Sequence, residues 1–259
     1  MRKIKVLGAR SAHMEYGISG TSYLVTKDIV IDAVNILRSL NKEAAQINHI
    51  FLSHCHVEHI ADIPFLIDAF FPVRKTPLYI YGLKQTLESL HEDIFNDSIW
   101  PDFSKIPMIG SDKSAIIFRE VAPNTETKIG DYSFKPILTA HSVMGAGYVI
   151  TYKGRAIYVA GNSYKCSRIW DEINANKAIK TAIIECSYPS VMQEFAEMNG
   201  HLTPTLLREE LSNLKRKDVQ IIIDCVGTVM KTSIIYELNS HPRTANLPII
   251  NDNDTIEFA

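Results

Sequence analysis

Residues 50–59 read Ile50-Phe51-Leu52-Ser53-His54-Cys55-His56-Val57-Glu58-His59, an apolar run that ends in four potential metal ligands. Side chains alternate along an extended chain, so we expect His54, His56 and Glu58 to project to one side. A helix that begins near His59 would turn that imidazole back toward the same place. Imidazole and carboxylate groups together suit zinc, manganese or iron. A polar loop with surface histidines is the alternative, but four ligands directly after a buried-type strand favour a metal site.

The runs on either side of this stretch predict two mixed β-sheets with helices on the outside. Early strands follow one another almost without helices, whereas a doubly wound parallel sheet would alternate strands and helices more strictly. Lys153-Gly154 predicts a hairpin turn, and Thr203-Pro204 predicts a helix start with threonine as the N-cap. We expect strands at 2–8, 21–25, 28–32, 49–53, 77–81, 115–121, 132–138, 147–152, 155–160, 180–185 and 219–224, and helices at 36–46, 60–71, 83–95, 166–175, 204–216 and 230–239.

The composition predicts one globular domain over residues 1–259. Of these residues, 46% are hydrophobic and 22% are charged, and no linker or internal repeat divides the chain. No apolar run approaches the ~18 residues that a membrane span needs. The first eight residues alternate charged and apolar side chains like a strand and lack the apolar block of a signal peptide. We therefore expect a cytoplasmic protein that does not bind membranes.

The charge balance argues against long nucleic acid as a partner. The chain has 27 basic and 29 acidic side chains and a net charge of −2, whereas nucleic-acid binding needs a basic surface. Its only compact basic cluster is Lys215-Arg216-Lys217, which we expect to form a solvated face at a helix end.

The stretch from His54 to His59 resembles the H-x-H-x-D-H signature of the metallo-β-lactamase superfamily. Further blocks lie at Leu78–Leu87, Ile94–Phe103, Ile184–Pro189 and Gly200–Pro204. They resemble the class II 3′,5′-cyclic-nucleotide phosphodiesterases, and the similarity covers about residues 20 to 240. The resemblance implies an α+β fold, a four-layer αβ/βα sandwich of two mixed β-sheets flanked by helices, with two metals in a cleft at one edge.

The resemblance also implies roles for individual residues. His54, His56 and His141 would hold the first metal, and Glu58 and His59 would serve the second. The family's bridging aspartate falls at Asn162 and its last histidine ligand at Cys225. The candidate catalytic residues are His201, placed near the scissile phosphate, Glu185, which would orient it, and Glu58.

Three positions depart from the family pattern: Glu58 and Asn162 each replace an aspartate, and Cys225 replaces a histidine. Glu58 keeps its charge, but the neutral amide of Asn162 bridges two cations poorly. A Cys225 thiolate restores the lost negative charge and is a good zinc ligand, which is compatible with an altered zinc or iron site. A mononuclear site on the three histidines is equally reasonable.

These observations lead to the hypothesis of a metal-dependent phosphodiesterase that hydrolyses a small phosphodiester, a 3′,5′-cyclic nucleotide such as cAMP or cGMP. The cofactor is expected to be one or two Zn²⁺ ions, with Mn²⁺ or iron as alternatives, and the resemblance implies a homodimer. A catalytically degenerate nucleotide-binding or metal-sensing module on the same fold is a second hypothesis. A third is a tRNA-processing nuclease of the ribonuclease Z kind, although the chain lacks an obvious basic arm for tRNA.

Overall fold

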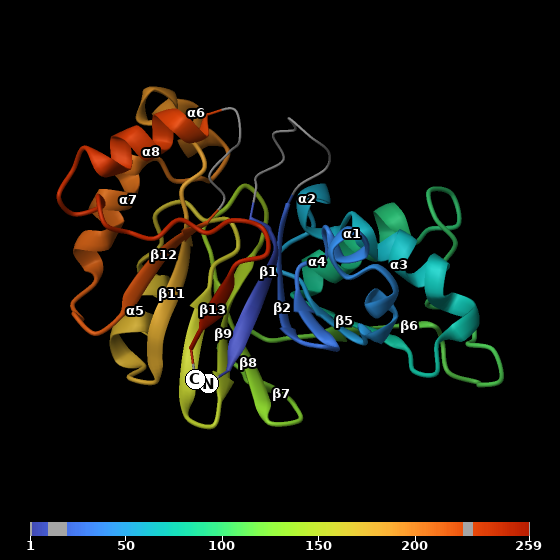
Figure 1. The fold of residues 1–259 in the computed structure, drawn as a ribbon. Coiled ribbons are helices and arrows are strands. Elements are labelled where there is room, and N and C mark those ends of the chain that lie inside the picture. The colour runs from blue at the N-terminus through green and yellow to red at the C-terminus, as the bar shows by residue number, and fades with distance from the viewer. Residues whose placement is uncertain (1, 10–19, 225–229, 259) are drawn as a thin grey trace.

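Two mixed β-sheets lie face to face in the computed structural model, which describes residues 2–9, 20–224 and 230–258 (Figure 1). Within these residues the first sheet has seven strands in the order β13-β1-β2-β3-β4-β5-β6, and the second has six in the order β12-β11-β10-β9-β8-β7. The first sheet consists of β1 (Lys3–Ala9), β2 (Thr21–Thr26), β3 (Ile29–Ile31), β4 (His49–Phe51), β5 (Leu78–Gly82), β6 (Ile116–Glu120) and β13 (Thr255–Glu257). The second consists of β7 (Thr127–Ile129), β8 (Tyr132–Leu138), β9 (Ala146–Tyr152), β10 (Arg155–Val159), β11 (Ile179–Glu185) and β12 (Gln220–Asp224).

Helices cover the outer face of each sheet, which completes the predicted four layers. Those on the first sheet are α1 (Ile36–Leu40), α2 (Val57–Ile60), α3 (Asp62–Phe70) and α4 (Lys84–Ser89). Those beside the second are α5 (Ser167–Ala175), α6 (Gln193–Met198), α7 (Pro204–Glu210) and α8 (Lys231–Asn239) (Figure 1). None of the helices in the described part of the chain has the length and hydrophobicity of a membrane span.

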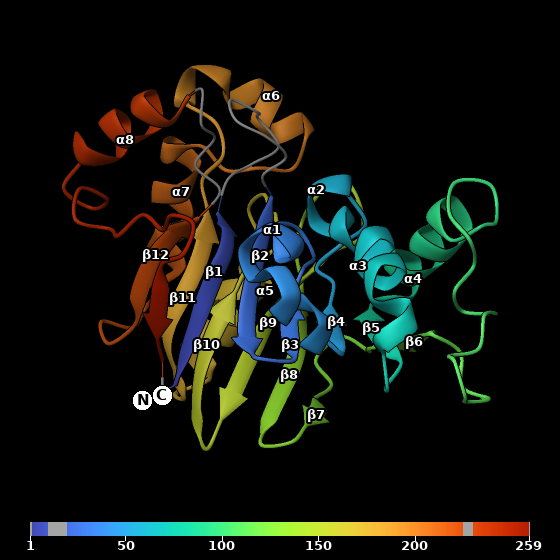
Figure 2. The ribbon, with the colours of Figure 1, turned by 45° about the vertical axis from the view of Figure 1, so that its right-hand side comes forward.

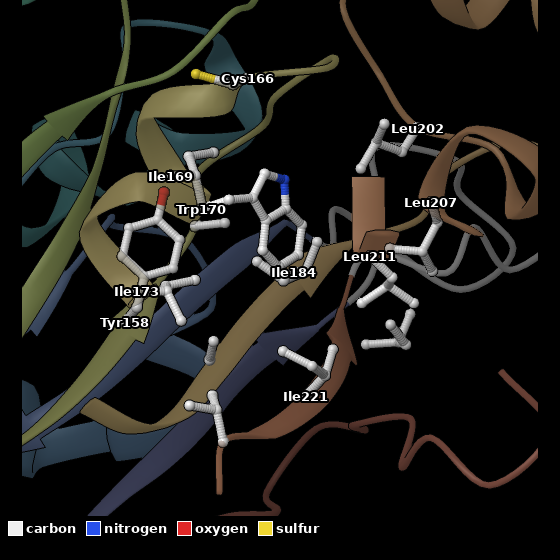
Figure 3. Close-up of a cluster of buried hydrophobic side chains, with 14 of the residues drawn as sticks. Tyr158, Cys166, Ile169, Trp170, Ile173, Ile184, Leu202, Leu207, Leu211 and Ile221 are labelled. Atoms are coloured by element: carbon white, nitrogen blue, oxygen red, sulfur yellow. The ribbon is translucent and has the colours of Figure 1, made fainter. Parts of the chain in front are cut away.

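The alternation of side chains along the strands explains why the core has three apolar layers, one between the two sheets and one outside each sheet. In β10, Ile157 and Val159 face the core between the sheets, whereas Ala156 and Tyr158 face the helices on the outside. The outer core of the second sheet is closed by Trp170 of α5, which packs near Tyr158 and Ile184 (Figure 3). The indole nitrogen of Trp170 donates to the carboxylate of Glu210 on α7 over 2.7 Å, so a polar contact also joins these two helices.

The predicted strands match the structure closely, and the predicted helices match in position but not in length. The helix expected at 36–46 becomes a 3₁₀ helix from Asn41, whose φ is +48°. Those expected at 83–95 and 204–216 end their α-helical parts at Ser89 and Glu210 and continue as a π turn and a 3₁₀ turn. Sequence patterns missed the short elements β7, β13 and α6.

Both predicted turn signals are confirmed. Lys153 and Gly154 have φ values of +46° and +78° and join β9 to β10 in an antiparallel hairpin. Thr203 is the N-cap of α7: its hydroxyl accepts a hydrogen bond from the Leu206 amide over 3.3 Å, and Pro204 occupies the first turn.

We expect Thr203→Ala to lower the free energy of unfolding by about 1 kcal/mol, because the Leu206 amide loses its buried acceptor. Urea denaturation measures the change. Thr203→Ser keeps the oxygen and should stay near the wild-type value. Equal stability of the alanine and serine variants would show that the capping hydrogen bond contributes nothing.

Candidate metal centre

Three histidines from two loops converge at one end of the sheets, the end where α2 and α6 lie (Figure 2). His54 and His56 follow β4, and His141 follows β8. His56 Nδ1 lies 3.2 Å from His54 Nε2 and 3.2 Å from His141 Nε2, and the three nitrogens lie within 4.8 Å of one another. Zinc–nitrogen bonds of 2.0–2.1 Å in a tetrahedral site separate neighbouring nitrogens by about 3.4 Å. Two of the three separations therefore match one such ion, and the third lies within 4.8 Å.

Hydrogen bonds on the outer side of two of the rings place the ring proton on Nδ1. They leave Nε2 with its lone pair free to bind a metal. His141 Nδ1 donates to the Gly200 carbonyl over 2.9 Å, which leaves Nε2 as the unprotonated nitrogen. The Ser53 hydroxyl donates to Asp32 and lies 3.0 Å from His54 Nδ1, from which it can accept. Both rings thus turn an Nε2 lone pair toward His56, as outer hydrogen bonds do for histidine ligands of metals.

All three rings are uncharged near neutral pH. Burial is the main cause: it lowers the pKa of His141 to about 4 and lowers the pKa of His54 well below its ordinary value. The pKa of His56 is also lowered, mainly by burial, although Glu58 opposes the shift. Because a histidine binds metal in its neutral form, the cluster is ready to accept an ion.

Close backbone approaches bring these loops together. Gly200 has a φ of +73°, and a Cβ on it would lie 2.8 Å from His141 Cα. A Cβ on Gly161 would lie 2.7 Å from the Ser53 Cβ. Larger residues at either position would force the loops apart. Gly161 thus sets the distance between Ser53 and the chain after β10, and Gly200 sets the distance between His141 and the loop before α7.

Asp32 is a site residue that the sequence analysis missed. Its carboxylate accepts hydrogen bonds from the Ser53 amide over 2.7 Å, from the Ser53 hydroxyl over 2.8 Å and from His59 Nδ1 over 2.8 Å. The side chain is 1% exposed. The available signal was its position at the end of the strand predicted at 28–32, because β3 and β4 are parallel neighbours and their carboxyl ends meet.

The residues predicted for a second metal are only partly assembled. The His59 ring lies beside His54, with ring centroids 4.1 Å apart, and its Nε2 lies 3.2 Å from the amide nitrogen of the buried Asn162. The expectation that the chain stays extended as far as Glu58 is wrong, because α2 begins at Val57 and turns the chain. Glu58 Oε1 lies 3.9 Å from His56 Nδ1 and the side chain is partly exposed. Cys225 lies outside the described residues.

His201 and the buried Glu185 form a partly buried pair beside the cluster. His201 Nδ1 lies 3.1 Å from Glu185 Oε1, and the His201 ring lies edge-on to His141 at 4.9 Å. Glu185 also accepts from the Leu202 amide over 3.2 Å and from the Ser187 hydroxyl. Burial opposes a charge on His201, but the Glu185 carboxylate, together with Glu58, outweighs it, so the pKa of His201 lies above its ordinary value.

Comparisons with known proteins agree with this architecture. The chain is 23% identical over 222 residues to a 3′,5′-cyclic-nucleotide phosphodiesterase of Schizosaccharomyces pombe, covering 76% of this chain and 59% of that protein. It thus spans little more than half the length of such relatives. The unliganded structure of yeast PDE1 superposes with a TM-score of 0.81 at 17% identity, covering 98% of this chain and 99% of that one. The Bacillus subtilis metallo-β-lactamase fold protein YhfI superposes with a TM-score of 0.73 at 17% identity, covering 99% of each chain.

These likenesses confirm the predicted fold class, the metallo-β-lactamase fold. The sequence profile of the family described as "cAMP phosphodiesterases class-II" matches residues 9–141, which is just over half of the chain and includes all three clustered histidines. The chain belongs to the class-II cAMP phosphodiesterase family.

Proposed function

We propose that this protein is a metal-dependent phosphodiesterase that hydrolyses a small phosphodiester, a 3′,5′-cyclic nucleotide. The observation that carries the proposal is the convergence of His54, His56 and His141 on one point beside the His201–Glu185 pair. Family membership supports the substrate class, since the relatives that match are cyclic-nucleotide phosphodiesterases.

His54, His56 and His141 would hold a divalent ion, which polarises a phosphoryl oxygen and makes water acidic enough to act as a nucleophile near neutral pH. The role of His201 follows from its own contacts. The Glu185 carboxylate accepts a hydrogen bond from His201 Nδ1. His201 Nε2 is therefore the position from which a proton can pass to the leaving ribose oxygen. The raised pKa of His201 keeps that proton available near neutral pH.

A panel of substrates tests the proposal. Purified protein is loaded with Zn²⁺, Mn²⁺ or Fe²⁺ and assayed for hydrolysis of cAMP, cGMP and a precursor tRNA. The proposal predicts nucleoside monophosphate as product from at least one cyclic nucleotide. Nucleotide binding without turnover under every metal would contradict it and support the degenerate binding module instead.

The basic cluster at 215–217 does not supply the basic surface that a tRNA-processing nuclease would need. The expectation that this cluster forms a solvated face is wrong for Arg216, which is 9% exposed. Its guanidinium donates to the carbonyls of Ile173 over 2.9 Å and Asn176 over 2.8 Å, and it pairs with Asp218. Arg216 therefore anchors α5 rather than offering a charge to a phosphate backbone.

Glu185 acts as a positioning residue, and its removal should move the pH profile. His201 donates a proton only while protonated, so kcat falls as the pH rises through its pKa. In Glu185→Gln the carboxylate no longer offsets burial, the pKa of His201 falls, and the descending limb of kcat should move to lower pH.

Glu210→Gln is the matched control, because Glu210 is also buried but binds Trp170 and the Cys166 amide away from His201. Glu210→Gln should lower the free energy of unfolding and leave the descending limb of kcat at the same pH. A limb that does not move in Glu185→Gln would show that Glu185 does not control the proton on His201.

A further inference from the structure

We infer that the protein binds one transition-metal ion, on His54, His56 and His141, and that Asp32 and Asn162 withhold His59 from a second ion. The inference deepens the proposed function and rests on its metal dependence. It departs from the two-metal site that the family resemblance implies, because the second set of residues does not fit a metal.

Hydrogen bonding occupies both nitrogens of His59. Nδ1 lies 2.8 Å from Asp32 Oδ2, and a carboxylate only accepts hydrogen bonds, so Nδ1 carries the proton. The lone pair with which His59 would bind a metal is then on Nε2. Nε2 lies 3.2 Å from Asn162 Nδ2, which has hydrogens to donate. The nitrogen that a second ion needs is therefore used by an amide.

Asn162 cannot easily turn away or be replaced by water. Its side chain is 5% exposed, and the preceding Gly161 packs the loop against Ser53. The amide is neutral, so it brings no negative charge to offset a second cation close to the first. The Glu58 carboxylate lies 3.9 Å from His56 Nδ1, but its side chain is 28% exposed and it does not belong to the group of converging donor atoms.

The positions of the possible metal-ligand atoms also set His59 apart from the three clustered histidines. In the part of the chain that the structure describes, one group of three or more histidine, cysteine or acidic side chains has all its donor atoms within 4.8 Å. That group contains His54, His56 and His141 and does not contain His59. His59 serves instead to fix Asp32 and, through Ser53, the ring of His54.

Metal stoichiometry tests the inference directly. Tag-free protein is stripped with chelator, dialysed against excess Zn²⁺, washed by gel filtration and analysed for zinc per chain. We expect one equivalent in the wild type. Asn162→Asp places a carboxylate, which donates no hydrogen bond when ionised, against His59 Nε2, and should bind a second equivalent. Asn96→Asp makes the same change of charge at an exposed position whose side-chain oxygen caps a turn, and should stay at one.

Titration with Co²⁺, followed by its visible absorption, gives a second readout that needs only the wild type and should reach its endpoint at one equivalent. Two equivalents in the wild type would overturn the inference and leave the proposed function intact. If Cys225→Ser then removed the second ion, Cys225 would be its missing ligand. A single equivalent in folded Asn162→Asp would also overturn the role given to Asn162. Absence of metal from the wild type would overturn both the inference and the proposed function.

Discussion

His56→Ala should abolish metal binding and turnover together. His56 Nδ1 is the nitrogen that lies 3.2 Å from each of the other two, so its loss leaves two imidazoles without the ligand between them. Loss of an outer hydrogen-bond partner already costs about 10- to 100-fold in metal affinity, so loss of a direct ligand should cost more than about 100-fold. Zinc per chain and the rate of cyclic-nucleotide hydrolysis are the two measurements, made on the same preparation.

His241→Ala is the matched control for this variant. His241 is exposed, and its ring accepts a hydrogen bond from the Arg243 amide far along the sequence from the cluster. Its removal should change neither metal content nor rate. His56→Ala should keep its fold, because His56 is partly exposed and lies at the N-cap of a four-residue helix. Full turnover in a metal-depleted His56→Ala protein would contradict the metal-dependent mechanism.

His201→Asn should lower kcat by about 10²- to 10⁴-fold while the metal stays bound, because a positioned general acid contributes that much to a rate. His201 lies next to His141 but does not belong to the group of converging nitrogens. Asparagine can still donate a hydrogen bond to Glu185, so the buried carboxylate keeps a partner. Steady-state kinetics measures kcat, and elemental analysis of the same sample shows whether the ion remains.

Comparing His56→Ala with His201→Asn separates an effect on metal binding from an effect on the chemical step. A substrate with a better leaving group, such as a nitrophenyl phosphodiester, needs less proton donation and should lose less rate in His201→Asn than a cyclic nucleotide does. Equal losses with both substrates would assign His201 a role in binding or structure. Loss of metal from His201→Asn would likewise contradict its assignment as a proton donor.

Much of the fold was predictable because burial imposes a short period on this chain. In β4 and β10 the apolar residues alternate between the inner core and the outer helices, and such strands are visible in sequence. Helix lengths were less predictable, because tertiary contacts end them. Asn41 has a φ of +48°, which breaks the helix expected at 36–46, and no local pattern specifies it. Short edge strands such as β13 owe their existence to pairing with a distant partner, β1.

The three-histidine cluster was predictable in part because His54 and His56 lie in one motif, whereas His141 was placed only through the family resemblance. Asp32 escaped notice because its role depends on β3 lying beside β4, which is a fact of topology. The direction in which Asn162 presents its amide also depends on the fold, since it is set by Asp32 fixing the tautomer of His59. Sequence thus indicates which ligands are present, and three-dimensional hydrogen bonding decides which of them face a metal.

The central claim of the proposed mechanism is that hydrolysis depends on the bound metal. The most direct measurement is the rate of cAMP and cGMP hydrolysis by one preparation in three states: as purified, stripped with chelator, and stripped then reloaded with Zn²⁺ or Mn²⁺. The proposed mechanism predicts turnover that disappears on stripping and returns on reloading, in proportion to the metal bound by His54, His56 and His141. Turnover that persists at full rate in the stripped protein, or no turnover in any reloaded sample, would contradict it.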